Sequence, residues 1–223
     1  HYALERRELV LHYQPQIDIR TGRVVNAEAL IRWRRDGVLV SPDAFVPVAE
    51  ESGLIEPIQE WVILAACWQY RLWREAGISP VPVAVNLTAN HFLSPSLFDT
   101  VATALGETGC PPEHLELEIT ESVLMRDVPR ALAQITALSE LGVRFSIDDF
   151  GTGYSSLAYL RSLPIDRLKI DRSFVNDLGT SRDAELLVGT MIGLARGLGL
   201  KVVAEGVETR EQAELLIDHG CPV

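Results

Sequence analysis

The sequence predicts an α/β fold in which short parallel strands form a modified TIM-like (β/α) barrel with one antiparallel strand. Short strand segments alternate with helical segments, as in parallel sheets with helical crossovers. The strand segments are almost continuously apolar, which is typical of strands covered on both faces. Most of them end in an acid, an amide or a base. An open doubly wound sheet, the competing architecture, concentrates its site at one switch point, whereas a barrel collects polar residues from many strand ends. The barrel is therefore favoured.

The first two strands are expected to form a hairpin. Leu9–Arg20 and Arg23–Trp33 are joined by Thr21-Gly22, a pair typical of a tight turn, so these two strands run antiparallel. The stretch 42–77 is helical and is broken near Ser52-Gly53. The later segments are strand Val83–Leu87, a helix ending near Gly109, strand Leu115–Ile119, helix Val128–Leu141, strand Val143–Ile147, a short helix from Ser155, strand Arg167–Ile170, helix Arg182–Gly197, strand Lys201–Ala204 and helix Glu211–His219.

Length and composition predict one globular domain. The chain has 223 residues, 47% of them hydrophobic, and no apolar run approaches the roughly twenty residues that cross a bilayer. We expect no membrane contact by this segment and a cytoplasmic location, including the cytoplasmic part of a membrane-anchored protein. Cys67, Cys110 and Cys221 suit a reducing compartment and are expected in the core. The net charge of −11 argues against a nucleic-acid polymer as partner, and an anionic substrate would need local cations.

Ten polar residues stand at the ends of the predicted strands. They are Glu28, Asn86, Glu118, Glu121, Asp148, Asp149, Lys169, Asp171, Glu205 and Glu208. Carboxylates this close repel one another, so either cations lie among them or several pKa values are raised. Oxygen donors without His or Cys indicate Mg²⁺, Mn²⁺ or Ca²⁺ rather than zinc. The adjacent Asp148 and Asp149 are suited to a site with two metal ions.

The segment from Asp149 to Leu157 contains Gly151 and Gly153, which allow positive φ and close approach to neighbours. It lacks the third glycine and the acidic partner of a dinucleotide-binding fingerprint. We interpret it as a loop that positions Asp148 and Asp149.

Seven motifs together resemble the EAL phosphodiesterases of bacterial second-messenger signalling. They are His12-Tyr-Gln-Pro15, Glu28-Ala-Leu-Ile-Arg-Trp33, Val85-Asn-Leu87, Glu116-Leu-Glu-Ile-Thr-Glu-Ser122, Asp148-Asp-Phe-Gly-Thr-Gly-Tyr-Ser-Ser-Leu157, Leu168-Lys-Ile-Asp171 and Ala204-Glu-Gly-Val-Glu208. The match runs in order from about Leu4 to Cys221. The resemblance implies a phosphodiesterase domain over 1–223 that hydrolyses cyclic di-GMP to linear pGpG with Mg²⁺ or Mn²⁺.

The resemblance also implies roles for individual residues. The metal ligands would be Glu28, Asn86, Glu118, Asp148 and Asp149. The attacking water would be positioned or deprotonated by Glu205 and Lys169, while Glu121 would brace the glycine-rich loop and Glu208 would support the rim. The substrate would contact Gln14, Leu30, Arg32 and, more weakly, Asp171.

Members of this family usually continue after a Gly-Cys pair such as Gly220-Cys221 into a further strand and helix, so we expect a C-terminally short domain. The resemblance also implies a homodimer formed beside the glycine-rich loop, and fusion to other signalling domains. A catalytically silent cyclic di-GMP receptor is the main alternative function. Two further alternative functions are an interaction domain that neither binds nor cleaves the nucleotide and a two-metal hydrolase of another phosphate ester.

Overall fold

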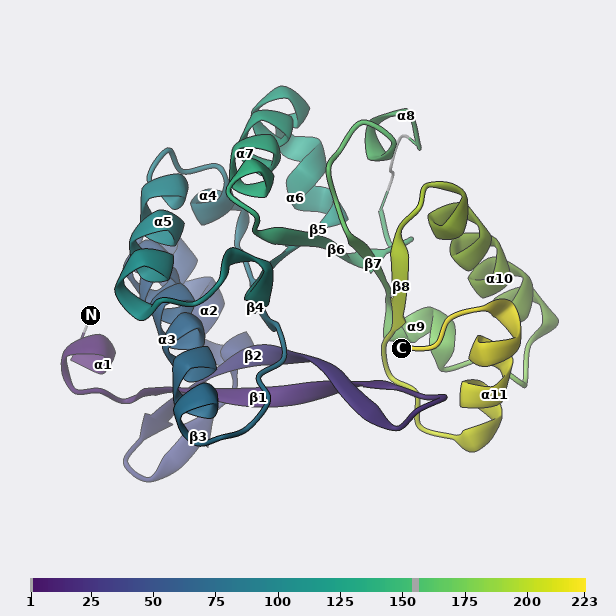
Figure 1. Ribbon diagram of the computed structural model, residues 1–223, viewed down its shortest axis with the longest axis horizontal. Helices are drawn as coiled ribbons and strands as arrows, with labels where there is room; N and C mark the ends of the chain where they lie inside the picture. Colours follow the sequence, from purple (N-terminus) through teal and green to yellow (C-terminus); the bar gives the residue numbers. More distant parts are fainter. Residues whose placement is uncertain (1, 154–156) are drawn as a thin grey trace.

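The computed structural model describes residues 2–153 and 157–223, and these form one strongly curled α/β sheet with helices on its outer side (Figure 1). The strands are β1 (Leu9–Asp18), β2 (Arg23–Arg35), β3 (Val38–Val40), β4 (Val83–Asn86), β5 (Leu115–Thr120), β6 (Arg144–Phe150), β7 (Arg167–Ile170) and β8 (Lys201–Ala204). The helices are α1 (Tyr2–Glu5), α2 (Pro42–Glu51), α3 (Ile55–Glu75), α4 (Ala89–Phe92), α5 (Leu97–Thr108), α6 (Glu121–Arg126), α7 (Val128–Glu140), α8 (Leu157–Leu160), α9 (Arg172–Val175), α10 (Arg182–Gly197) and α11 (Arg210–His219), with a 3-10 turn at Pro112–His114.

The strand order is β1-β2-β4-β5-β6-β7-β8, and β3 pairs with the C-terminal end of β2. Strand β1 is antiparallel to β2, whereas each pair from β2–β4 to β7–β8 is parallel. This arrangement confirms the predicted α/β barrel-like fold with an antiparallel first strand. Because the strands from β2 onward are parallel, their carboxyl ends meet at one rim.

The sheet curls until β8 approaches β1, and the last residues lie between the two. The amide of Ile19 donates to the carbonyl oxygen of Pro222 at 2.7 Å, and the amide of Ala204 donates to that of Val223 at 2.8 Å. Among the described residues no strand pairs β8 directly with β1. The open side of the barrel is therefore bridged by backbone bonds to Pro222 and Val223.

The core lies between the sheet and the outer helices, and the central strands are buried on both faces. Strand β5 is almost wholly buried, as are Phe145 and Ile147 of β6. The amphipathic helices α3, α7 and α10 bury aliphatic stripes against this sheet, and α5 packs mainly against α3. All three cysteines are free and buried, as expected from the sequence.

The structure adds elements that the sequence pattern did not reveal. Strand β3 was missed because three residues are too short for a periodic signal. The predicted break near Ser52-Gly53 is confirmed as the junction of α2 and α3, where Gly53 has a φ of 72°. The expected start of a helix at Ser155 lies outside the described residues. No helix in the described part of the chain has the length and apolar character needed to span a membrane.

Candidate active site

The centre of the site is the ammonium group of Lys169, which β7 directs into the concave interior of the sheet. The side chain of Lys169 is 1% exposed. Its Nζ lies 2.9 Å from Glu118 Oε2, 3.2 Å from Glu28 Oε2, 3.2 Å from Asp148 Oδ1 and 2.7 Å from Glu205 Oε1. These four carboxylates come from β2, β5, β6 and the turn after β8. The fold therefore brings residues from distant parts of the sequence around one buried cation.

Asn86 joins this group through Glu28. The Nδ2 of Asn86 donates a hydrogen bond of 2.7 Å to Glu28 Oε1, which leaves the amide oxygen of Asn86 free to accept. Asn86 ends β4, between the strands that carry Glu28 and Glu118. Gln59 of α3 donates to the backbone carbonyl of Asn86 at 3.1 Å and so fixes the end of this strand.

Burial has the largest effect on the pKa values of Glu118 and Glu205. It raises the pKa of Glu118 to about 8, although Lys169 opposes the shift. Burial also raises the pKa of Glu205, again against the effect of Lys169. For Lys169 itself, burial alone would lower the pKa, but the four surrounding carboxylates outweigh it and raise the pKa well above its ordinary value. The lysine is therefore charged, and it holds together acids that would otherwise repel one another.

Asp149 follows Asp148 in β6 but points elsewhere, because its φ of 53° turns the chain sharply. Its amide donates to Asp148 Oδ1 at 3.0 Å. Burial, with smaller contributions from Asp148 and Asp171, raises the pKa of Asp149. Asp171 accepts hydrogen bonds from the amide and hydroxyl of Ser173 and thereby caps α9. Asp149 and Asp171 thus lie together beside the cluster around Lys169, and both are half-buried.

The glycine-rich loop rests on Glu121, the first residue of α6. Glu121 Oε2 accepts a hydrogen bond of 3.2 Å from the amide of Gly151, and the side chain of Glu121 is buried. A Cβ atom at Gly153 would lie 3.1 Å from the Glu121 carboxyl, and one at Gly151 would lie 2.4 Å from Met191 of α10. Gly151 is therefore required by its close neighbours and its φ of 97°, a Cβ at Gly153 would press against the Glu121 carboxyl, and the loop is packed between Glu121 and α10.

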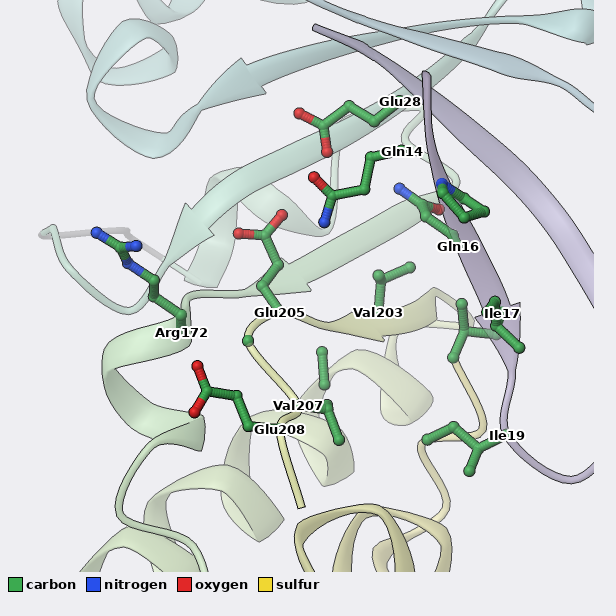
Figure 2. Close-up of a pocket in the computed structure, with 14 residues that line it drawn as sticks. Gln14, Gln16, Ile17, Ile19, Glu28, Arg172, Val203, Glu205, Val207 and Glu208 are labelled. Atoms are coloured by element: carbon green, nitrogen blue, oxygen red, sulfur yellow. The ribbon is translucent and has the colours of Figure 1, made fainter. Parts of the chain in front are cut away.

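A cleft of about 520 Å³ opens beside the lysine, between β1 and the turn after β8. Its lining includes Gln14, Glu28, Arg172, Glu205 and Glu208. Figure 2 shows the side-chain ends of Gln14, Glu28 and Glu205 gathered on one side of this cleft. The cleft thus joins the lysine cluster to solvent.

The remaining predicted substrate contacts lie away from this cleft. Leu30 lines a neighbouring cavity of about 360 Å³ together with Asn86 and Thr120. Arg32 is half-buried on β2, and its Nη1 donates to the carbonyl of Ile31 at 2.8 Å. The sequence interpretation missed Arg172, although it directly follows a recognised motif. Gly206 approaches Arg172 so closely that a Cβ atom there would lie 2.7 Å from the arginine Cβ.

The types of donor atom in this site suit a hard divalent cation. Their positions in this structure do not yet surround one. All donors are carboxylate or amide oxygens, and the buried Glu118 Oε1 has no hydrogen-bond partner among the described residues. In the same part of the chain, no three His, Cys, Asp or Glu residues are already arranged around a metal position. Instead, the Lys169 ammonium lies among the acids.

The profile of the EAL domain matches residues 1–223, so the chain belongs to the EAL domain family. It is 49% identical over 220 residues to a Pseudomonas aeruginosa protein named bifunctional diguanylate cyclase/cyclic di-GMP phosphodiesterase MucR, which covers 98% of this chain and 32% of that protein. The cyclic di-GMP phosphodiesterase NbdA of the same organism is 45% identical over 220 residues, with 98% and 28% covered. The chain spans about a third or less of the length of these relatives.

Solved structures of the family share the fold. A cyclic di-GMP complex of the MucR phosphodiesterase is 49% identical, has a TM-score of 0.94 and aligns over 99% of this chain and 90% of that chain. The FimX EAL domain of Xanthomonas citri, also in complex with cyclic di-GMP, is 28% identical, with a TM-score of 0.90 over 98% and 85%. The barrel-like architecture predicted from the sequence is therefore that of the EAL domain family.

Proposed function

We propose that the chain is a cyclic di-GMP phosphodiesterase that hydrolyses one phosphodiester bond of the cyclic dinucleotide to give linear pGpG. The carboxylate cluster around Lys169 is the observation that carries this proposal, because β2, β5, β6 and the turn after β8 together supply it and it borders an open cleft. Two relatives with 45% and 49% identity bear this activity in their names. In the reaction, a water oxygen forms a bond to phosphorus, the ring P–O bond breaks and the leaving oxygen takes a proton.

Mg²⁺ or Mn²⁺ is the proposed cofactor, held by two overlapping sets of ligands. Glu28, Asn86, Glu118 and Asp148 would hold one ion, and Asp148 with Asp149 would hold the second. The excess of acids over the single lysine supports this assignment, because Lys169 compensates only one negative charge. When bound, the ions supply Lewis acidity for the phosphate and the attacking water. Glu28 and Asp148, which now contact Lys169, would share their carboxylates between the ammonium and the ion.

Lys169 and Glu205 are proposed to position the attacking water, and Glu205 to take its proton, because the Lys169 ammonium is already protonated. Their polar atoms lie 2.7 Å apart, and Glu205 also lines the cleft, so it is the acid of this pair that solvent reaches. Because burial raises the pKa of Glu205, its carboxylate is a stronger base than an exposed glutamate. Glu121 would act on this site indirectly by holding the glycine-rich loop, and Glu208 would support the rim.

Substrate binding is proposed to involve Gln14, Leu30, Arg32 and Asp171. Gln14 supports this most directly, because it lines the cleft beside Glu28, its register partner on β2. Leu30 faces the adjacent cavity, and the guanidinium of Arg32 suits a phosphate oxygen. We add Arg172, which brings a cation to the cleft that otherwise exposes Glu205 and Glu208.

The alternative is a catalytically silent receptor for cyclic di-GMP. It is favoured by the position of Lys169, whose ammonium lies among the acids, and the described residues contain no preassembled set of metal ligands. The complete set of oxygen donors favours the hydrolase. The two functions are separated by incubating the protein and Mg²⁺ or Mn²⁺ with cyclic di-GMP or bis(4-nitrophenyl) phosphate and measuring binding by calorimetry and products by chromatography.

Selective conversion of cyclic di-GMP to pGpG supports the hydrolase. Binding without product supports the receptor. Comparable cleavage of the nitrophenyl ester supports a hydrolase of another phosphate ester, and the absence of both binding and cleavage supports an interaction domain.

We further propose a homodimer formed through α10 beside the glycine-rich loop. Met191 of α10 lies against Gly151, and one turn earlier Leu186 and Leu187 are 69% and 49% exposed. Exposed leucines on a helix that packs on the active-site loop are suited to a second copy of the chain. Sedimentation of wild type and of the Leu186→Glu/Leu187→Glu variant tests this. A wild type that stays monomeric at assay concentrations while fully active contradicts it.

The cellular setting follows from the same proposal. The three cysteines are free and buried, which suits the reducing cytoplasm, where a membrane-anchored protein can also expose such a domain. Because the chain spans only about a third of its relatives, we propose that other signalling domains accompany it in the whole protein. Fractionation of cells that produce the whole protein would locate the domain.

A further inference from the structure

A second polar layer lies beneath the lysine cluster, deeper in the concave interior of the sheet. Each member stands two residues from a member of the upper layer on the same strand, and side chains two apart on a strand share one face. The members of this lower layer are Gln16 on β1, Asn26 on β2, Glu116 on β5, Ser146 on β6 and Arg167 on β7. Their upper-layer counterparts are Gln14, Glu28, Glu118, Asp148 and Lys169.

The lower layer is held by contacts that cross the interior between strands that are not neighbours. Arg167 Nε lies 3.4 Å from Glu116 Oε2, although β6 separates their strands. Asn26 Nδ2 donates to the same Glu116 oxygen at 3.0 Å across β4. Arg167 Nη1 donates to Gln16 Oε1 at 3.2 Å, which ties β7 to β1 over the open side of the barrel. Glu116 and Arg167 therefore connect four strands.

Stability alone does not account for this ion pair. Glu116 is 0% exposed and Arg167 is 6% exposed, so both charges have lost almost all contact with water. Replacing such a buried pair by apolar residues of similar volume is often neutral or stabilising. Barrel interiors are usually filled with layers of branched apolar side chains. A charged layer in this position indicates a second role.

The pairing pattern shows what that role is. The two acids of β5, Glu116 and Glu118, face the two bases of β7, Arg167 and Lys169, so the ion pairs stack as two rungs between the same strands. The lower rung fixes the separation and height of β5 and β7. We propose that the Glu116–Arg167 pair is a positioning pair that holds Glu118 and Lys169 in place for catalysis. This inference rests on the proposed function and goes beyond it, because neither residue touches the cleft.

The test replaces the pair by apolar residues of similar size, Glu116→Leu with Arg167→Met, in the full chain. We expect an unchanged or higher melting temperature, a KM within about twofold of wild type, and a kcat and a Mn²⁺ affinity each lower by about tenfold or more. A purely structural pair would instead change stability together with activity. The control is Leu117→Ile with Leu168→Ile, which alters the neighbouring core positions of the same two strands. It should leave kcat and the Mn²⁺ affinity unchanged.

A double variant with wild-type kcat and wild-type Mn²⁺ affinity overturns the inference. If the wild type itself gives no product, the proposed function fails, and the Mn²⁺ affinities still decide whether the pair positions Glu118. If the double variant does not fold, Glu116→Gln decides, because glutamine keeps the size of the side chain but removes the negative charge that pairs with Arg167. It should lower kcat by about threefold or more, and an unchanged kcat contradicts the proposal.

Discussion

Lys169 Nζ lies 2.9 Å from Glu118 Oε2, and both side chains are almost completely excluded from solvent. Three further carboxylates lie within 3.2 Å of the same nitrogen. The Lys169 ammonium is thus the common ion-pair partner of all four carboxylates. It permits the acids to stand close together, and its removal should affect both folding and chemistry.

Lys169→Met should lower the free energy of unfolding by about 3–5 kcal/mol, since it leaves buried carboxylates without their counterion. The matched control is Arg210→Met, which breaks the exposed pair with Glu214 on α11 and should cost no more than about 0.5 kcal/mol. Urea unfolding at neutral pH compares the two. Equal losses in the two variants would show that Lys169 does not hold the acids together.

Glu28→Ala and Asp148→Ala should each abolish turnover of cyclic di-GMP while the domain remains folded. Both residues are proposed metal ligands, and each also contacts Lys169 at 3.2 Å. Product formation and circular dichroism measure the two effects, with the exposed Glu214→Ala as control. A variant that keeps the wild-type rate removes that residue from the metal site.

Gly153→Ala should lower kcat by about 10- to 100-fold, because the new Cβ would lie 3.1 Å from the Glu121 carboxyl and displace the support of the loop. Gly193→Ala is the control, since nothing lies within 4 Å of a Cβ at that helical position. This control should stabilise α10 by roughly 0.5–1 kcal/mol and leave kcat unchanged. If Gly153→Ala is fully active, Glu121 is not required to hold the loop.

The stability of the domain should fall as the pH drops below the ordinary histidine pKa of 6.5 because of His91. His91 is fully buried, and neither ring nitrogen has a hydrogen-bond partner in the described residues. Burial lowers its pKa, and nearby Glu56 only partly offsets this. The unfolded chain therefore binds a proton that the folded chain does not. Unfolding curves between pH 5 and 8 should show a smaller loss for His91→Gln than for wild type or for the exposed His12→Gln. Parallel curves for all three proteins would exclude this origin.

The alternation of apolar strands and helices was enough to predict the barrel-like fold, because parallel strands buried on both faces leave a strong pattern. The antiparallel hairpin was equally clear from Thr21-Gly22. Strand β3 could not be predicted, since its three residues acquire strand character only by pairing with β2. Helices α4 and α9 were missed for a similar reason, as a single turn carries no periodicity.

The polar strand ends were recognisable as one site, but their mutual contacts were not. The resemblance implied that Lys169 positions or deprotonates the attacking water, and only the curled sheet shows that four carboxylates lie within 3.2 Å of its ammonium group. Glu116 and Arg167 were not singled out because a charged residue within a strand usually faces solvent. Their pairing depends on contacts between strands far apart in the chain, which no local pattern encodes.

The proposed phosphodiesterase is tested by incubating the purified chain with cyclic di-GMP and Mg²⁺ or Mn²⁺ and separating the products by chromatography, with an excess of EDTA as control. We expect linear pGpG to form with either ion and the chelator to prevent its formation. Formation of pGpG at the same rate in EDTA would contradict the metal site, and bound but uncleaved cyclic di-GMP in the presence of both ions would contradict the phosphodiesterase itself.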